Sequence, residues 1–200
     1  MDYIKHLQKD AKLATILGEE VHQLQFHKNI PLRLIASIMS QQLSTKVAAV
    51  IFKRFLALFN DEEPTPAQIA NTPFETLKAI GLSANKTNYI LNVAHFCIEH
   101  HIKDTLLISM DNESIIKTLT QIKGVGVWTT EMLLMFSLGR EDVFAVDDLG
   151  IQQAMQRLYG LDNSNTKSLK KEMQLIAEAW KPFRTYACLH LWKWKDAVPA

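Results

Sequence analysis

Two glycines interrupt a helical pattern in the stretch Leu119-Thr120-Gln121-Ile122-Lys123-Gly124-Val125-Gly126-Val127-Trp128-Thr129-Thr130-Glu131-Met132-Leu133-Leu134. The pattern predicts two helices joined by a tight turn at Gly124-Val125-Gly126. Glycine allows positive φ and close approach of another backbone, and a helix that starts beside such a turn presents N–H groups that can bind a phosphate. Glycines can also serve only to close an αα-hairpin. The stretch therefore predicts a helical hairpin and leaves both roles of its glycines open.

The rest of the chain is also typical of helices. Apolar residues recur at spacings of three and four from Leu32 to Phe59, and the polar stretch 40–45 interrupts them with a turn in which Ser44 or Thr45 caps the next helix. Capping boxes with proline at the first helical position are expected at Thr65 and Thr72, and Pro182 is expected in the first turn of the last helix. No alternating stretch of strand length is present. We expect an all-α protein with about ten helices.

Composition excludes several classes without naming a function. The chain has 200 residues, 48% hydrophobic and 22% charged, with a net charge of +1, so bulk charge does not indicate a nucleic-acid binder. No run of eighteen apolar residues suggests a membrane span, and Met1–Asp10 does not resemble a secretory signal. We therefore expect an intracellular protein. Cys97 and Cys188 cannot supply a four-cysteine zinc or iron–sulfur site, and two buried thiols are favoured over a disulfide.

A second motif, Val146-Asp147-Asp148-Leu149-Gly150-Ile151, follows the hairpin by about twenty residues. A carboxylate at the start of a helix is usually a cap that the helix dipole stabilises. Taken alone, the motif favours such a cap, and the second aspartate changes this only slightly, because one cap needs only one carboxylate.

Four segments in this order resemble the helix-hairpin-helix DNA glycosylase superfamily, and most closely its 3-methyladenine DNA glycosylase II branch. They are Ile38–Ser44, Gly124–Gly126 followed by Trp128, Val146–Asp148, and the run from Trp180 to Trp192. The resemblance implies a two-lobed all-α fold with a cleft between the lobes, in one compact domain over 1–200. It places one lobe at about 31–138, with the hairpin at 119–136, and the other at about 1–30 plus 139–200. The N-terminal β domain of some members is expected to be absent.

The resemblance also implies the reaction. Such enzymes flip a damaged nucleotide into a pocket, and a carboxylate supports cleavage of the N-glycosidic bond through an oxocarbenium-like state. The catalytic aspartate of the family falls on Asp148, which leaves Asp147 a structural role, although the sequence alone also allows the roles to be exchanged. Bifunctional relatives carry a Schiff-base lysine where this chain has Trp128. We therefore expect hydrolysis of the glycosidic bond and no lyase step.

The expected substrates are alkylated purines of the 3-methyladenine and 7-methylguanine type. Trp128 and Trp192 match aromatic pocket positions of the family, and indole faces attract the positive charge of such bases. Met132 stands where a well-studied member of the branch has a tyrosine, which leaves the range of substrates open. Tyr186 and His190 line the pocket or simply pack, and the two tryptophans are core anchors if the resemblance is set aside.

Contacts with DNA are expected at two turns. Gln42, with Leu43 as second choice, falls where the family inserts a side chain into the gap left by the flipped base. Amides of the hairpin are expected to bind a phosphate, and carbonyls of the hairpin to hold Na⁺ or K⁺, with no other cofactor required. The amides are those of Gly124, Val125, Gly126 and Val127; the carbonyls are those of Thr120, Ile122 and Val125; Lys86 and Lys46 are weaker electrostatic candidates.

The expected partner is damaged double-stranded DNA, bound by a monomer that needs no protein partner and no membrane. The expected site of action is the cytoplasm or nucleoid of a prokaryote, or the nucleus of a eukaryote. Three alternatives remain open. The chain could act on an oxidised, deaminated or etheno base, it could be a non-catalytic structure-specific DNA-binding module, or it could be an unrelated helical scaffold whose glycines are caps.

Overall fold

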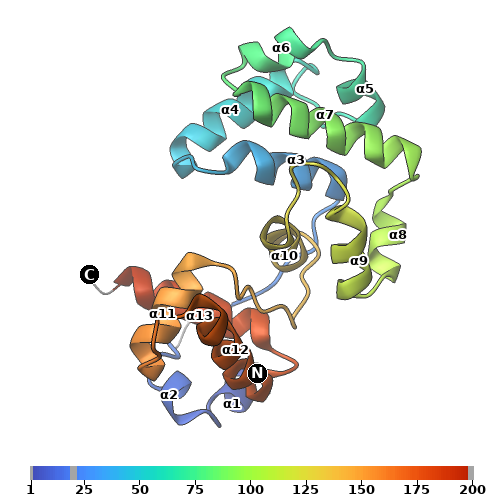
Figure 1. Cartoon of the computed structure of the whole chain (residues 1–200). Helices are drawn as coiled ribbons and strands as arrows, with labels where there is room; N and C mark the ends of the chain where they lie inside the picture. The colour runs from blue at the N-terminus through green and yellow to red at the C-terminus, as the bar shows by residue number, and fades with distance from the viewer. Residues whose placement is uncertain (1, 19–21, 198–200) are drawn as a thin grey trace. The chain divides into compact units, whose positions relative to one another are not determined.

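A computed structural model describes residues 2–18 and 22–197, and all regular structure within these ranges is helical (Figure 1). Thirteen α-helices and one 3-10 turn, but no strand, occur in this part of the chain. The predicted all-α class is confirmed. The expected number of ten helices is too low because three short helices carry little sequence periodicity: α1 (Asp2–Leu7), α2 (Ala11–Ala14) and α8 (Asp104–Ser109).

None of the helices in the described ranges has both the length and the apolar character that crossing a membrane requires.

The chain divides into two compact units, one of residues 26–138 and one of residues 1–25 together with 139–200. The larger unit begins at Phe26, a few residues earlier than the expected boundary near 31. The reason is a contact ahead of its first helix. The Asp104 carboxylate accepts the N–H groups of Asn29 at 2.7 Å and of Ile30 at 2.8 Å, which ties this segment to α8.

The larger unit is built around α3 (Ile30–Ser40), whose buried face carries Leu34, Ile35 and Ile38. This helix packs against α4 (Thr45–Ala57), α7 (Ala84–Glu99) and α10 (Val127–Phe136). The remaining helices of this unit are α5 (Pro66–Ala70), α6 (Phe74–Ala79), α8 and α9 (Asn112–Leu119). Figure 1 shows α3 running beneath α7, with α9 leading through a loop into α10. The hairpin is therefore anchored in the core of this unit.

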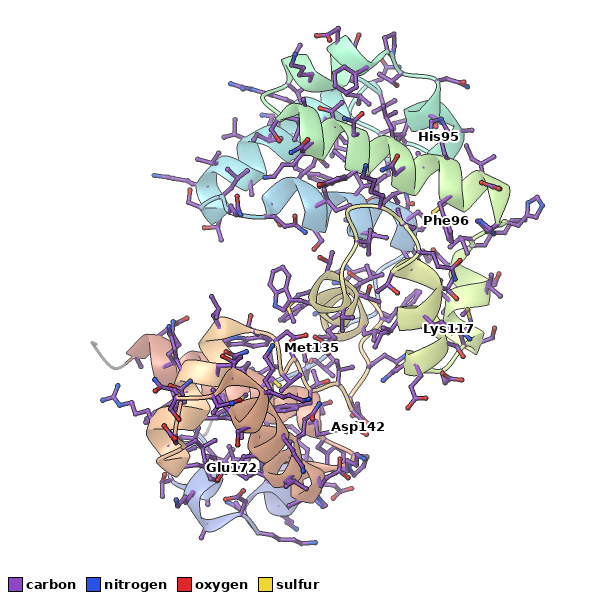
Figure 2. All side chains as sticks on the ribbon, viewed as in Figure 1. His95, Phe96, Lys117, Met135, Asp142 and Glu172 are labelled. Atoms are coloured by element: carbon purple, nitrogen blue, oxygen red, sulfur yellow. The ribbon has the colours of Figure 1, made fainter. Side chains whose placement is uncertain are left out.

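The smaller unit combines an N-terminal segment with a C-terminal segment of the chain. It contains α1, α2, α11 (Leu149–Tyr159), α12 (Thr166–Ala177), the turn η1 (Glu178–Trp180) and α13 (Arg184–Ala197). The helices α11 and α13 pack side by side. An ion pair fixes the loop that precedes α11, because the guanidinium of Arg184 donates to both oxygens of Asp142 at 2.5 and 3.0 Å (Asp142 is labelled in Figure 2). This packing brings the start of α11 close to α13.

The Thr65 capping box is confirmed, whereas the one expected at Thr72 is wrong. The Thr65 hydroxyl accepts the Gln68 N–H at 3.3 Å, and the Gln68 side chain accepts the Thr65 N–H at 2.9 Å. The Thr72 hydroxyl instead donates to the Gln68 carbonyl at 2.9 Å, which leaves Pro73 at the N-cap of α6. The Thr72 side chain is thus directed toward the end of the preceding helix, and α6 begins without a side-chain cap.

The helix expected from Pro182 begins later, at Arg184, and the Lys181–Pro182 peptide bond is cis. Pro182 therefore belongs to the turn before α13 and not to its first helical turn. The expected burial of two free thiols is confirmed at Cys97 and Cys188. Burial also raises the pKa of the Cys97 thiol to about 12, so that it stays protonated at neutral pH.

Candidate functional site

The hairpin between α9 and α10 depends on Gly124. Its φ is +105°, and a Cβ atom at this position would lie 2.2 Å from the ring of Tyr89 on α7. The neighbouring Lys123 carbonyl accepts a hydrogen bond of 3.0 Å from the Asn92 side chain, also on α7. The turn is thus pressed against α7, and any side chain larger than hydrogen at position 124 would displace it.

The start of α10 is open toward solvent. Gly126 is its N-cap, no side chain caps it, and a Cβ atom built at Gly126 would meet nothing within 4 Å. Gly126 and Val127 are both exposed. The N–H of the buried Val125 already donates to the Ile122 carbonyl at 3.0 Å. Of the amides expected to bind phosphate, those of Gly126 and Val127 are therefore the better placed.

The hairpin also carries the carbonyls of Thr120, Ile122 and Val125. Thr120 is the C-cap of α9, where the last carbonyls of a helix lack helical partners. Uncharged carbonyl oxygens suit a monovalent cation better than a transition metal. No group of three or more His, Cys, Asp or Glu side chains that could hold a metal occurs among residues 2–18 and 22–197.

A hollow of about 490 Å³ lies within the larger unit, between α3, α4 and α10. Trp128, Met132 and Phe136 line it from α10, one helical turn apart, and Met135 on the same helix is fully buried (Figure 2). Its other lining residues are Arg33, Ala36, Ser37, Ser40, Ala48, Ala49, Phe52, Leu133 and Ser137. The structure thus brings Trp128 and Met132 together in one largely apolar hollow.

The turn between α3 and α4 presents Gln42 to solvent. Gln42 has a φ of +58° and is exposed, whereas Leu43 is half-buried. Ser44 is the N-cap of α4, and its hydroxyl accepts the Val47 N–H at 3.4 Å, so Ser44 and not Thr45 provides the cap. Gln42 is therefore the better placed of the two residues expected to enter DNA.

The two lysines near this turn differ. Lys46 is exposed on the first turn of α4. The Lys86 ammonium donates to the carbonyls of Met39 at 2.9 Å and Gln41 at 2.6 Å, at the C-terminus of α3. Burial lowers the pKa of Lys86 below its usual value. The Lys86 ammonium is thus already hydrogen-bonded within the protein, whereas an electrostatic contact with DNA would require an exposed ammonium.

In the smaller unit, Asp148 meets Trp192. Asp148 is the N-cap of α11, and its Oδ1 accepts the Ile151 N–H at 2.9 Å and the indole N–H of Trp192 at 2.8 Å. Both side chains are half-buried. The carboxylate is thus held by a helix start and by an aromatic side chain from α13.

Sequence reasoning missed the role of Gly150. A Cβ atom at this position would lie 3.0 Å from Oδ1 of Asp148 and 3.1 Å from Cδ1 of Trp192. Glycine thereby lets the carboxylate and the indole meet. The motif around Asp148 does contain this glycine, but only the packing of α13 on α11 reveals what it approaches.

Asp147 has a different environment. It is exposed, and its Oδ1 forms an ion pair of 2.6 Å with Nζ of Lys170 on α12. The two neighbouring aspartates therefore have separate partners, one a surface lysine and the other a helix start with an indole.

Tyr186 and His190 occupy the core of the smaller unit. The Tyr186 ring stacks on Tyr3 with centroids 4.0 Å apart, and its hydroxyl donates to Glu141 at 2.8 Å. Burial raises the pKa of Tyr186, and the Glu141 carboxylate raises it further. His190 is buried with its ring edge against His22. These contacts fit the packing alternative for both residues.

Comparison with known proteins identifies the chain. Residues 35–182 match the HhH-GPD superfamily of base excision DNA repair proteins. The chain is 38% identical over 186 residues to DNA-3-methyladenine glycosylase 1 of Schizosaccharomyces pombe, covering 91% of this chain and 80% of that protein. It is 29% identical to DNA-3-methyladenine glycosylase 2 of Escherichia coli, of which it spans 55%.

Solved structures agree. The S. pombe 3-methyladenine DNA glycosylase Mag1 in complex with abasic DNA superposes with a TM-score of 0.82, at 35% identity and 96% coverage of both chains. A DNA-3-methyladenine glycosidase from Bacillus halodurans gives a TM-score of 0.85, at 34% identity, covering 98% of this chain and 90% of that one. The predicted family and branch are confirmed: the chain belongs to the HhH-GPD superfamily of base excision DNA repair proteins, among relatives that are 3-methyladenine DNA glycosylases.

Proposed function

We propose that the protein is a monofunctional DNA glycosylase that excises alkylated purines such as 3-methyladenine and 7-methylguanine from duplex DNA. The observation that carries the proposal is the placement of Asp148, whose carboxylate is held at the start of α11 by the indole N–H of Trp192. The identity of 38% to a 3-methyladenine glycosylase over most of both chains supports the same activity. The proposed site of action is then the compartment that contains the DNA, which is the nucleoid of a prokaryote or the nucleus of a eukaryote.

Asp148 provides the charge that the reaction needs. As the bond between C1′ and the purine nitrogen breaks, its electron pair leaves with the base and the sugar becomes an oxocarbenium-like cation. A carboxylate fixed beside the sugar stabilises that charge without moving. The water oxygen then bonds to C1′, and the proton that the water loses passes to the carboxylate and on to solvent. The ion pair with Lys170 gives Asp147 a structural role in this scheme.

The absence of a lyase step follows from Trp128. A Schiff base requires an amine that can attack the sugar, and an indole cannot form one. Trp128 and Met132 line the hollow of the larger unit, and both are suited to an electron-poor purine, since an indole face attracts cations and a thioether is polarisable. We assign both to the base pocket. A cationic base is a good leaving group, so that aromatic contacts and one carboxylate suffice.

Two turns of the larger unit would bind DNA. The exposed amides of Gly126 and Val127 at the start of α10 offer a phosphate site, and the exposed Gln42 would fill the gap that the flipped nucleotide leaves. Carbonyls of Thr120, Ile122 and Val125 would hold Na⁺ or K⁺, whose positive charge would favour the phosphate nearby. The DNA is bound by a monomer.

The test is release of free base from methylated duplex DNA by wild type, Asp148→Asn and Asp147→Asn. Wild type is expected to release 3-methyladenine and 7-methylguanine. Asp148→Asn keeps the shape but loses the charge, so its single-turnover rate should fall by at least about a hundredfold while binding persists. Asp147→Asn is the matched control and should stay within about threefold of wild type, because its ion pair is exposed.

Full activity of Asp148→Asn would overturn the catalytic assignment, and a large loss in Asp147→Asn would exchange the two roles. Borohydride should not trap wild type on methylated DNA, and a covalent adduct would contradict the assignment of Trp128. If wild type binds abasic DNA but releases no alkylated base, oxidised, deaminated and etheno bases are the substrates to assay next.

A further inference from the structure

The turn between α3 and α4 holds Gln42 in a conformation that its own side chain does not favour. Its φ of +58° lies in the left-handed region, which costs conformational energy for any residue with a Cβ atom. Such a conformation persists only when the surrounding structure imposes it. Gln42 is also exposed, so the restraint has to come from the backbone on either side of it.

That restraint is visible in the carbonyls at the end of α3. The Ser37 carbonyl accepts the Ser40 hydroxyl at 2.9 Å, and the Ser40 carbonyl accepts the Leu43 N–H at 3.1 Å. The carbonyls of Met39 and Gln41 both accept from the ammonium of Lys86, at 2.9 and 2.6 Å. A cation at a helix C-terminus is also favoured by the helix dipole. Lys86 therefore links the last turn of α3 to the residue immediately before Gln42.

Lys86 is itself held in place. It lies in the first turn of α7, where its N–H donates to the N-cap hydroxyl of Ser83 at 3.3 Å. The helices α3 and α7 pack directly against each other. Burial lowers the pKa of Lys86, because loss of hydrating water disfavours the charged ammonium.

A hydrogen bond between side chains links the same turn to the hairpin. The side-chain amide of Gln41 donates to the hydroxyl of Thr129 at 3.1 Å. Thr129 is buried in the first turn of α10, next to the amides assigned to the phosphate. The turn that carries Gln42 is thus connected on one side to α7 and on the other to the hairpin.

We propose that Lys86 is a positioning residue for DNA recognition, which holds the carbonyls of Met39 and Gln41 so that Gln42 stands ready to enter the duplex, and that it does not bind a DNA phosphate. This rests on the proposed function through the role of Gln42. A turn that is already ordered loses less conformational entropy when DNA binds. The affinity for DNA rises in consequence only where a nucleotide has left a gap, because only there does Gln42 enter the duplex.

The experiment compares the full-length wild type with Lys86→Met and Lys86→Arg. The probes are a duplex with a tetrahydrofuran abasic-site analogue and the matching intact duplex, each titrated over a series of salt concentrations. Lys86→Met should weaken binding to the abasic duplex about tenfold and to intact duplex less than about threefold, with an unchanged salt slope. Lys86→Arg, which retains donors for both carbonyls, should recover most of the preference.

Amide hydrogen exchange on the free proteins tests the tie without DNA. Lys86→Met should exchange faster at Gln42, Leu43 and Ser44, and Lys86→Arg should not.

Two control variants test other causes of a changed preference for the abasic duplex. Lys53→Met removes one charge from an exposed position on α4 and should leave the preference unchanged. Thr65→Ala removes the cap of α5, which has no hydrogen bond to the turn between α3 and α4, and reports whether a general loss of stability alone alters the preference.

A phosphate contact would give the opposite pattern, namely equal weakening on both duplexes and a salt slope smaller by about one, and that result would overturn the proposal. Unchanged exchange around Gln42 in Lys86→Met would overturn it as well. If wild type itself does not prefer the abasic duplex, the role assigned to Gln42 in the proposed function fails, and the part of this proposal that concerns DNA fails with it.

Discussion

The indole N–H of Trp192 donates a 2.8 Å hydrogen bond to Oδ1 of Asp148, across the packed pair of helices α13 and α11. The same oxygen accepts the Ile151 N–H at 2.9 Å. An aspartate that only capped a helix would need the bond from Ile151 but not the bond from Trp192. The relationship therefore gives Trp192 a role in fixing where the charge of Asp148 lies.

Loss of the indole N–H should slow the chemical step. Trp192→Phe keeps an aromatic ring but removes the donor, and a hydrogen bond to a charged group at a part-buried site is worth about tenfold in rate. Single-turnover release of 7-methylguanine should fall by that factor, while the affinity for abasic DNA stays near the wild-type value. A loss confined to binding would show that Trp192 acts only as a surface for the base.

Gly150→Ala should disturb the same pair. The added Cβ would lie 3.0 Å from Asp148 Oδ1 and 3.1 Å from Trp192 Cδ1, so one of the two side chains has to shift. Misplacement of a catalytic group can cost about tenfold to a hundredfold in rate. We expect a loss of that size in single-turnover base release, with DNA affinity retained. Wild-type activity, together with the increase in Tm that alanine normally brings to a helix, would show that the contact is harmless.

Truncation of Gln42 should weaken lesion recognition selectively. Gln42→Ala and Gln42→Gly both remove the side chain, and Gln42→Gly also relieves the left-handed backbone at φ +58°. Both variants should lose affinity for the abasic duplex more than for intact duplex in direct binding titrations. Equal losses on the two duplexes would show that Gln42 does not fill the gap left by the flipped nucleotide. A loss in Gln42→Ala alone would indicate an effect of the backbone.

Asp10 should make the stability of the protein sensitive to acid. Its carboxylate accepts hydrogen bonds from Trp180 Nε1 at 2.9 Å, from the Tyr159 hydroxyl at 2.7 Å, and from the N–H groups of Lys12 and Leu13 at 3.0 Å. Burial raises the pKa of Asp10, but these hydrogen bonds to the charged form outweigh it and leave the pKa below the usual value of 3.8.

The folded pKa of Asp10 is depressed, so its contribution to stability is present above the unfolded value of about 4 and is lost as pH falls through the folded value. Asp10→Asn should lower the Tm at pH 7, and the difference in Tm between wild type and variant should shrink below pH 4. Thermal melts at pH 7, 4 and 3 measure it. A difference that does not change with pH would mean that the shape of the side chain matters and its charge does not.

The hairpin was predictable from the sequence because its signals are local. Gly124 and Gly126 mark a turn wherever they stand between helical patterns, and the run of apolar residues after Gly126 predicts the helix α10. The same holds for the Thr65 capping box, whose partners lie three residues apart. Thr72 has the same pattern but forms no capping box, because its side chain is directed toward the Gln68 carbonyl at the end of the preceding helix.

The sequence by itself determined the all-helical class, the hairpin, the family and the pair of aspartates, because each depends on residues close together in the chain or on motifs in a characteristic order. The tertiary structure decided what those residues do. Trp192 reaches Asp148 from 44 residues away, and Lys86 reaches Gln41 from 45 residues away. Neither spacing corresponds to a local helical repeat. Only the packing of α13 on α11 and of α7 on α3 could therefore bring these donors to their acceptors.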